Sequence, residues 1–170
     1  FIDEVAYEID EDPLALRLLN LRVKGVNKGA KKSDPLPTSF GGGKRLANVL
    51  KIASGLANYG RSDLPEGTSL GIAASGAETR YNPSFVACIA QVAVDKSSAA
   101  IDVQKLICAI DAGIVINPDG VKAQVEGSLM WGLSAALLEK MTLDNGHVAE
   151  RNFDTYKWQN MTKMPEIEIH

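Results

Sequence analysis

Two long apolar segments, residues 85–95 and 99–111, constrain the fold of this chain more than any other feature of its sequence. Val, Ile, Ala and Cys fill both segments almost without interruption, and only the short polar turn at residues 96–98 separates them. This pattern is typical of strands that are buried on both faces, whereas half-exposed strands alternate apolar and polar residues. We therefore expect two strands covered on both faces, preceded by a strand at residues 70–75 and a polar loop at residues 76–84.

Helical periodicity marks the segments around these strands. Apolar residues recur every three or four positions over residues 2–21 and again over residues 46–57, as they do in amphipathic helices. Asp12-Pro13 interrupts the first stretch, so two helical pieces are expected there, with Asp12 as the N-cap of the second. A further helix is predicted over residues 118–139.

The C-terminal part of the chain carries three more local signals. Asn117 precedes Pro118 at the start of the predicted helix, where a side-chain cap and a proline at the first position are favoured. Asp-Asn-Gly at residues 144–146 has the chemistry of a hairpin turn. Glu alternates with Ile over residues 166–169, which predicts a strand, and because the chain stops at His170 we expect it to be part of a longer protein.

Together these elements predict an α+β fold in which helices pack on a mixed β-sheet. Residues 1–44 are expected to form a helical lead-in and a Gly- and Lys-rich connection, and residues 45–170 to form the α+β domain itself. The connection, residues 24–44, has little apolar content. Loops of this length cover a partner or a ligand site, or act as linkers, and both interpretations stay open.

Charge and the length of the apolar runs argue against two classes of function. The chain has 18 Lys and Arg against 21 Asp and Glu, a net charge of −3, and no long basic run. It therefore lacks the basic surface that binds nucleic-acid phosphates or anionic membranes. The longest mostly apolar stretch, residues 125–138, is interrupted by Gly, Ser and Glu and is too short to span a bilayer. We expect no nucleic-acid partner and no membrane span in this chain.

The two cysteines and the two histidines show no pattern of a metal or catalytic site. Cys88 and Cys108 lie in apolar runs and form no C-x-x-C motif, so buried free thiols are expected rather than a zinc site or a disulfide. His147, in the predicted hairpin, and His170 form no recognisable triad or metal cluster with them. No metal ligand is predicted.

Two other motifs are interpreted as structural. Gly-Gly-Gly-Lys at residues 41–44 is similar to a nucleotide phosphate loop, but Arg45 stands in place of Ser or Thr and Thr38 in place of Gly. A flexible connection is expected there instead. Asp111, at the end of a predicted strand, is interpreted as a turn or cap acceptor rather than a catalytic group.

Gln124 is the candidate binding residue. It lies in the first two turns of the helix predicted over residues 118–139, where its amide could meet an anion near the helix N-terminus. The alternative is an ordinary solvated residue, and neighbouring Glu126 is interpreted as a structural hydrogen-bonding group. The same helix contains Gly127 and Gly132, each of which costs about 1 kcal/mol relative to Ala. Such small residues are favoured where a sheet or a ligand approaches a helix closely.

Three motifs resemble one enzyme family. They are Cys-Ala-Ile-Asp-Ala-Gly-Ile-Val-Ile-Asn-Pro at residues 108–118, Gln-Val-Glu-Gly at residues 124–127 and Gly-Leu-Ser-Ala-Ala-Leu at residues 132–137. Together they resemble the molybdopterin-binding large subunit of the xanthine dehydrogenase/aldehyde oxidase family. Within it the isoquinoline 1-oxidoreductase β-subunit type looks most similar, because it shares the Asn-Phe-x-x-Tyr and Met-Pro-Glu-Ile-Glu patterns of residues 152–156 and 164–168.

The resemblance implies a molybdenum-dependent oxidoreductase. Enzymes of this family hold molybdenum on molybdopterin, usually in the cytosine dinucleotide form, and hydroxylate an aldehyde or an N-heterocycle with oxygen from water. Electrons then leave through 2Fe–2S clusters of a partner small subunit or domain. Gln124 matches the glutamine of the family's Gln-Val-Glu-Gly motif, which lies close to the pterin, so the resemblance implies that Gln124 binds the cofactor.

The family's catalytic glutamate has no counterpart in this chain. It belongs to a Gly-Glu-Pro motif that follows the Met-Pro-Glu-Ile-Glu strand, beyond His170. Glu166 and Glu168 alternate with Ile on a predicted strand face and are not candidates for that role. We therefore expect no catalytic residue here, no cofactor bound to these residues alone, and no activity without the rest of the subunit.

Two further classes of function stay open. The chain could be a structural or subunit-docking module without cofactor chemistry, or a stand-alone domain that binds a small molecule. Relatives that carry export signals favour a periplasmic over a cytoplasmic location.

Overall fold

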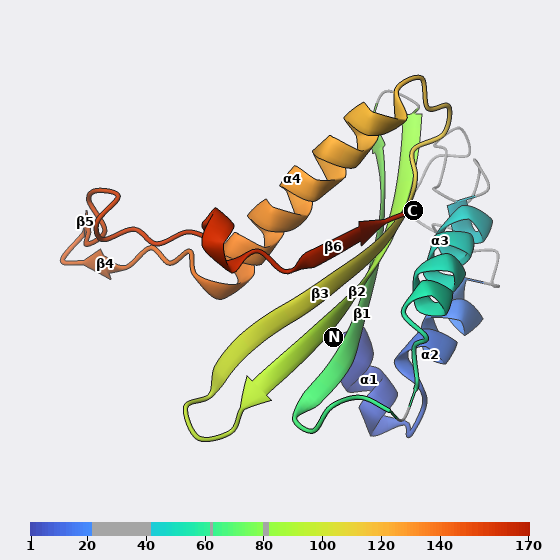
Figure 1. Ribbon diagram of the computed structural model, residues 1–170, viewed down its shortest axis with the longest axis horizontal. Coiled ribbons are helices and arrows are strands. Elements are labelled where there is room, and N and C mark those ends of the chain that lie inside the picture. The colour runs from blue at the N-terminus through green and yellow to red at the C-terminus, as the bar shows by residue number, and fades with distance from the viewer. Residues whose placement is uncertain (22–41, 62, 80–81) are drawn as a thin grey trace. The chain divides into compact units, whose positions relative to one another are not determined.

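The computed structural model describes residues 1–21, 42–61, 63–79 and 82–170, which form two compact units (Figure 1). The sheet unit comprises Phe1–Ile114 and Glu166–His170, and the α4 unit comprises Val115–Pro165. Most of the predicted Gly- and Lys-rich connection falls in residues 22–41, outside the described residues. The expected boundary between residues 44 and 45 therefore stays a prediction.

A mixed four-stranded sheet forms the centre of the sheet unit, as predicted. Its strand order is β1-β2-β3-β6. The three long strands β1 (Thr68–Thr79), β2 (Asn82–Asp95) and β3 (Ala100–Asp111) run antiparallel to their neighbours, whereas β6 (Glu166–Ile169) runs parallel to β3. The sheet and the helices packed on it confirm the α+β fold.

The polar loop predicted at residues 76–84 is wrong, because the two strands continue through it. β1 extends to Thr79, β2 begins at Asn82, and Gly76 pairs with Phe85 in the ladder. A Cβ at position 76 would lie only 2.8 Å from Cδ1 of Phe85. The glycine therefore makes room for the ring of a core residue, and pairing with β2 holds its backbone in the strand.

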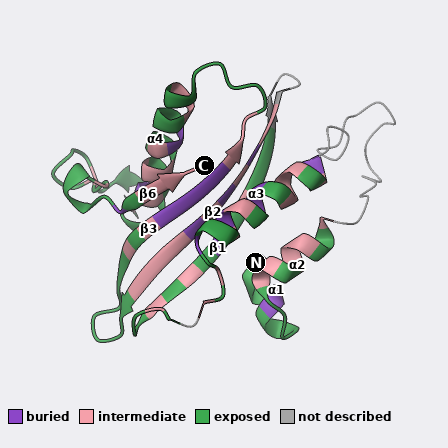
Figure 2. Cartoon of the chain, turned by 45° about the vertical axis from the view of Figure 1, so that its right-hand side comes forward, coloured by how far each residue is buried: buried purple, intermediate pink, exposed green. Residues whose placement is uncertain are grey.

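Helix α3 (Gly42–Leu56) covers one face of the sheet with the apolar stripe that its periodicity predicts (Figure 2). Val49 and Leu50 are almost completely buried there. The core cluster of the sheet unit combines this stripe with side chains from three strands: Val49, Leu50, Ala53, Ala57, Ile72, Phe85, Ala87, Ile89, Ile107 and Ala109.

The start of α3 differs from the sequence expectation. Gly42, Gly43 and Lys44 form the first turn of the helix rather than a flexible connection, while residue 41 lies outside the described residues. A Cβ at Gly43 would lie 3.1 Å from the carbonyl oxygen of Leu21. A small residue is needed here because the start of α3 lies against the residue that ends the preceding helix.

Burial in β3 agrees with the prediction of a strand covered on both faces only in its C-terminal part, because the first half of the strand is largely exposed. Four consecutive residues, Leu106 to Ala109, are buried, although their side chains point alternately to opposite faces. In β2 the pattern is weaker, since Phe85, Ala87 and Ile89 are buried and the residues between them are half-buried.

Two short helices, α1 (Ile2–Glu8) and α2 (Pro13–Asn20), confirm the interruption predicted at Asp12-Pro13. The Asp12 side chain accepts a hydrogen bond from the Ala15 amide at 2.8 Å, as expected of an N-cap. Leu14 and Leu18 of α2 pack against the core cluster.

The α4 unit contains α4 (Pro118–Leu137), the short hairpin of β4 (Leu143–Asp144) and β5 (His147–Val148), and the 3-10 helix η1 (Met161–Lys163). The Asn117 side chain accepts a hydrogen bond from the Gly120 amide at 3.1 Å, which confirms the predicted cap. Asn145 and Gly146 have φ values of 48° and 80°, as in a type I′ hairpin turn. Across the described ranges, no helix is both long and apolar enough to cross a membrane.

Candidate functional site

Gln124, the predicted cofactor-binding residue, lies two turns into α4 with its side chain exposed. Gly127 and Ser128 follow one turn later on the same helix face. The Ser128 hydroxyl donates to the main-chain carbonyl of Gln124 at 2.7 Å. A Cβ at Gly127 would meet no atom within 4 Å among the described residues. The surface beside Gln124 is therefore an open strip of helix that presents an amide, a hydroxyl and bare backbone.

The close approach expected at the helical glycines stays a prediction. Within the described part of the chain, a Cβ at Gly132 also meets nothing within 4 Å. Within the α4 unit these glycines therefore have no close neighbour. A role in letting another group approach α4 is consistent with this open surface.

Asp111 acts as a turn acceptor, as predicted, and is also one half of an ion pair that the sequence analysis missed. Its carboxylate accepts hydrogen bonds from Nε of Arg45 at 2.7 Å, Nη2 of Arg45 at 2.6 Å and the Gly113 amide at 3.0 Å. The guanidinium also lies 4.8 Å from the ring centroid of Phe85. The hydrogen bonds from Arg45 and Gly113 hold the pKa of Asp111 below its usual value.

This ion pair ties the first turn of α3 to the end of β3. Arg45 and Asp111 are 66 residues apart, so no local pattern links them. The sequence alone drew attention to Arg45 only because it replaces the Ser or Thr of a nucleotide phosphate loop. The pair makes Asp111 a structural anchor whose carboxylate is already engaged.

Glu166 and Glu168 are also engaged in structural ion pairs. Both lie on β6, and Nζ of Lys105 on β3 approaches each carboxylate at 2.9 Å. The hydrogen bonds that Lys105 donates to these carboxylates raise its pKa, and the bond to Glu166 has the larger effect. Both glutamates therefore have a structural partner, and the expectation that neither replaces the family's catalytic base stays a prediction.

The two cysteines are free thiols, as predicted; Cys108 is buried and Cys88 is partly buried, and the two lie side by side on neighbouring strands. Cys88 on β2 is paired with Cys108 on β3. Hydrogen bonds from the His170 amide to the Cys108 carbonyl and from the Ile110 amide to the His170 carbonyl show that Cys108 turns its backbone groups toward β6. The cysteines therefore occupy a non-hydrogen-bonded pair, in which side chains lie close together. Burial raises the pKa of Cys88 to about 11 and that of Cys108 to about 12.

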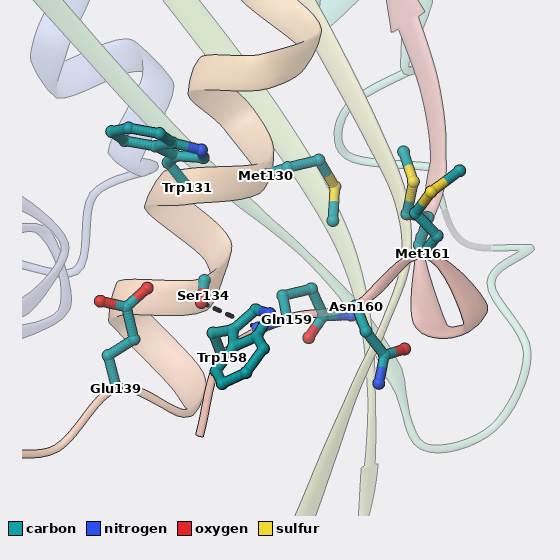
Figure 3. A pocket seen from close by; sticks show the side chains of 9 residues that line it. Met130, Trp131, Ser134, Glu139, Trp158, Gln159, Asn160 and Met161 are labelled. Atoms are coloured by element: carbon teal, nitrogen blue, oxygen red, sulfur yellow. Dashed lines mark hydrogen bonds between the residues drawn. The ribbon is translucent and has the colours of Figure 1, made fainter. Parts of the chain in front are cut away.

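A pocket in the α4 unit was not predicted from the sequence (Figure 3). We call it the Trp–Met pocket. It has a volume of about 510 Å³ and lies between the C-terminal half of α4 and the segment around η1. It is lined by Met130, Trp131, Ser134, Glu139, Trp158, Gln159, Asn160, Met161 and Met164. The lining includes both tryptophans and three of the four methionines of the chain, but these residues lie in two segments that no sequence pattern connects.

Metal-binding side chains do not gather in the part of the chain that the structure describes. No group of three or more His, Cys, Asp or Glu residues there could hold a metal ion. His147 lies exposed on β5, and His170 follows β6.

Residues 51–165 match the family model described as the molybdopterin cofactor-binding domain. The chain is 40% identical over 169 residues to a membrane-bound aldehyde dehydrogenase of Gluconacetobacter polyoxogenes, whose name specifies pyrroloquinoline quinone. That match covers 99% of this chain and 21% of that protein. The chain is 29% identical over 170 residues to isoquinoline 1-oxidoreductase subunit beta of Brevundimonas diminuta, a match covering 99% of this chain and 19% of that protein.

Among solved structures, quinoline 2-oxidoreductase from Pseudomonas putida 86 aligns with a TM-score of 0.50 and 26% identity, over 52% of this chain and 11% of that one.

The chain spans about a fifth of the length of the two curated relatives named above. The isoquinoline 1-oxidoreductase β-subunit type, which the motifs favoured, is among these relatives, but at lower identity than the aldehyde dehydrogenase.

Proposed function

Because the chain belongs to the molybdopterin cofactor-binding domains of the xanthine dehydrogenase and aldehyde oxidoreductase large-subunit family, we propose that it supplies one wall of the cofactor site in a molybdenum hydroxylase. The family match over residues 51–165 is the observation that carries this proposal. It includes Gln124 and the open strip of α4 beside it.

The residues of this strip suit one edge of a pterin. A pterin is flat and bears ring nitrogens and a carbonyl, so it needs both hydrogen-bond donors and acceptors. The exposed amide of Gln124 offers both. The missing side chain of Gly127 lets a flat ring approach the helix backbone, where a Cβ meets no described atom within 4 Å.

In this proposal residues 1–170 bind and orient the cofactor but do not provide the catalytic base. Bound molybdopterin, in its cytosine dinucleotide form, would supply the molybdenum centre for oxidation of an aldehyde or an N-heterocycle with oxygen from water. Gln124 would hold the pterin edge. The family's catalytic glutamate belongs to a Gly-Glu-Pro motif that residues 1–170 do not contain, so we place the catalytic base outside them; Glu166 and Glu168 pair with Lys105. A small subunit with 2Fe–2S clusters would take the electrons.

The test measures molybdenum per polypeptide by elemental mass spectrometry in the full-length protein, co-expressed with its neighbouring subunit in a host that loads known molybdenum enzymes. Gln124→Ala is compared with Lys122→Ala, an exposed change on the opposite side of the same helix. We expect close to one equivalent of molybdenum in the unchanged protein and the Lys122 variant. Loss of one or two hydrogen bonds to the cofactor should lower occupancy about tenfold in the Gln124 variant under limiting cofactor.

Two outcomes would contradict the proposal. Full molybdenum in the Gln124 variant, with weaker association between the subunits, would favour a docking module over a cofactor wall. Absence of molybdenum from the unchanged protein, together with bound pyrroloquinoline quinone, would instead connect the chain to the cofactor in the name of its 40% identical relative.

A further inference from the structure

The Trp–Met pocket is the part of the α4 unit that the proposed function does not use. Its walls hold large apolar side chains that solvent reaches freely. Trp131 is 82% exposed and Met161 is 85% exposed, and both line the pocket. Soluble proteins seldom leave such residues together on a surface unless another group covers them. Tryptophan and methionine are also enriched where protein surfaces meet.

Three polar side chains of the pocket, Ser134, Glu139 and Asn160, already have partners within the α4 unit. The Ser134 hydroxyl, on a buried side chain, accepts the Gln159 amide at 2.9 Å. A Glu139 carboxylate oxygen accepts the Tyr156 hydroxyl at 2.8 Å. The Asn160 side chain accepts the Thr162 amide at 3.1 Å. A polar ligand would have to compete with these bonds, whereas an apolar occupant would gain contacts with the aromatic and thioether walls.

One wall is also held in place before anything binds. Trp158 packs edge-to-face against Phe153, with ring centroids 5.2 Å apart. The bond between Ser134 and Gln159 fixes the next residue of that segment to α4. A preformed wall lowers the entropic cost of seating an apolar group.

The length of the relatives indicates which polypeptide could supply the occupant. They match 99% of this chain, yet the match is only about a fifth of their own sequences. If this chain is part of such a subunit, as the proposed function assumes, most of that polypeptide lies outside residues 1–170. A segment of the same polypeptide reaches the pocket at a high effective concentration, without the cost of bringing two molecules together.

We propose that the Trp–Met pocket seats an apolar side chain from a segment of the same subunit outside residues 1–170, and so docks the α4 unit in the assembled protein. In the full-length protein Trp131 and Met161 then become covered. The pocket serves assembly and does not bind substrate.

The first measurement needs no substitution. Hydroxyl-radical labelling of the full-length protein, read by mass spectrometry, compares the oxidation of Trp131 and Met161 in the native and urea-unfolded states. A residue that stays 82% exposed would be protected only marginally. Coverage of the kind found at buried anchor residues should slow oxidation by at least about fivefold. Marginal protection of both residues would overturn the proposal.

The second measurement identifies what covers the pocket. Trp131→p-benzoylphenylalanine in the full-length protein, with its partner subunit present, should cross-link to a peptide of the same polypeptide outside residues 1–170. The same photoreactive residue at Met141, which is 67% exposed and outside the pocket, should not capture that peptide. Cross-links to the partner subunit, to a second copy or only within residues 1–170 would each overturn the proposed occupant.

Molybdenum content in the same preparation separates this inference from the proposed function. Molybdenum present with Trp131 unprotected would reject the docking role alone. Molybdenum absent with Trp131 protected and cross-linked as expected would reject the cofactor assignment and leave the docking role supported.

Discussion

Replacing Arg45 with alanine removes two charge-assisted hydrogen bonds that tie α3 to the end of β3. The guanidinium donates to Asp111 at 2.6 and 2.7 Å, and the two side chains are only 24% and 32% exposed. The substitution also removes a contact with the face of the Phe85 ring and leaves the Asp111 carboxylate without its charged partner. We expect the free energy of unfolding to fall.

The magnitude follows from the geometry of the pair. Hydrogen bonds to charged groups contribute about 1.5–3 kcal/mol when partly buried, and exposed ion pairs about 0.2–1 kcal/mol. At roughly one-quarter to one-third exposure, Arg45→Ala should cost about 2 kcal/mol. A double-mutant cycle with Asp111→Ala should give a coupling energy of about 1–1.5 kcal/mol, because each single change also removes other contacts.

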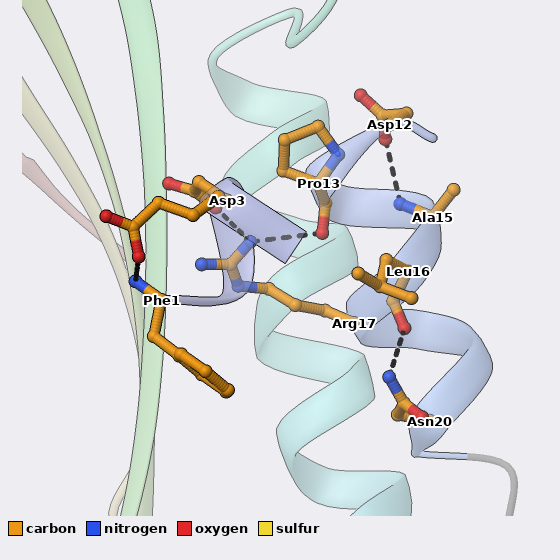
Figure 4. Close-up of polar contacts among 9 residues, drawn as sticks. Phe1, Asp3, Asp12, Pro13, Ala15, Leu16, Arg17 and Asn20 are labelled. Atoms are coloured by element: carbon orange, nitrogen blue, oxygen red, sulfur yellow. Dashed lines mark hydrogen bonds and ion pairs between the residues drawn. The ribbon is translucent and has the colours of Figure 1, made fainter. Parts of the chain in front are cut away.

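The ion pair between Arg17 and Asp3 provides the matched control (Figure 4). There a single guanidinium nitrogen approaches the carboxylate at 2.6 Å, and Asp3 is 54% exposed. Its coupling energy should be below about 0.5 kcal/mol. Urea unfolding of the 170-residue chain, followed by circular dichroism, gives both cycles. A coupling between Arg45 and Asp111 no larger than that between Arg17 and Asp3 would refute the reasoning.

The same pair predicts a dependence of stability on pH. Arg45 holds the pKa of Asp111 below its unfolded value, which is about 3.9 in model peptides. The stabilisation is therefore fully present above that unfolded value and is lost as pH falls through the folded pKa. Asp111→Asn should flatten the acid limb of the stability profile below about pH 4. An unchanged acid limb would show that the carboxylate is not held in this way.

Two further predictions concern the sheet. Gly76→Ala should destabilise the chain by about 1–3 kcal/mol, because its Cβ would meet the buried Phe85 ring at 2.8 Å. Gly71→Ala is the control and should be close to neutral, because its Cβ would meet no atom within 4 Å. Equal urea midpoints for the two variants would contradict this prediction. Cys88 and Cys108, whose pKa values are raised to about 11 and about 12, should react with iodoacetamide at pH 8 at least about tenfold more slowly in the folded chain than in urea. Equal rates in the two states would show that the thiols are accessible and ionise normally.

Local patterns in the sequence were sufficient for most of the fold. The cap at Asp12 and the interruption by Pro13 depend on residues a few positions apart, and so do the cap at Asn117 and the turn at residues 144–146. Each of these signals works through backbone geometry within one or two turns of chain. The predicted elements that rest on them appear in the structure.

The incorrect structural predictions occur where the local composition suggests a loop but tertiary packing produces a strand or a helix. Gly76 looks like a loop residue, yet its backbone pairs with Phe85 in the sheet, and the Phe85 ring occupies the space that a side chain would need. Gly43 looks like part of a flexible connection, yet it lies in the first turn of α3, where its Cβ would be 3.1 Å from the carbonyl oxygen of Leu21. In each case the reason for the glycine is a neighbour in space, and that neighbour is identified only once the chain is folded.

The candidate site divides in the same way. Gln124 was chosen from its motif, and its role stays a proposal because its contacts would be made with a group outside this chain. The Trp–Met pocket combines residues 130–139 with residues 158–164, and each segment taken alone looks like ordinary helix or loop. No hydrophobic periodicity or fixed sequence spacing links these two segments.

The sequence by itself therefore determined which segments become helices and strands, where they are capped, and which family the motifs resemble. These properties depend on side-chain periodicity and on hydrogen bonds between near neighbours in the chain. Only the tertiary structure decided that Arg45 anchors Asp111 across 66 residues, that Cys88 faces Cys108, and that both tryptophans line one pocket. Such contacts form when loop closure and packing bring distant segments together, and neither segment encodes the identity of its partner.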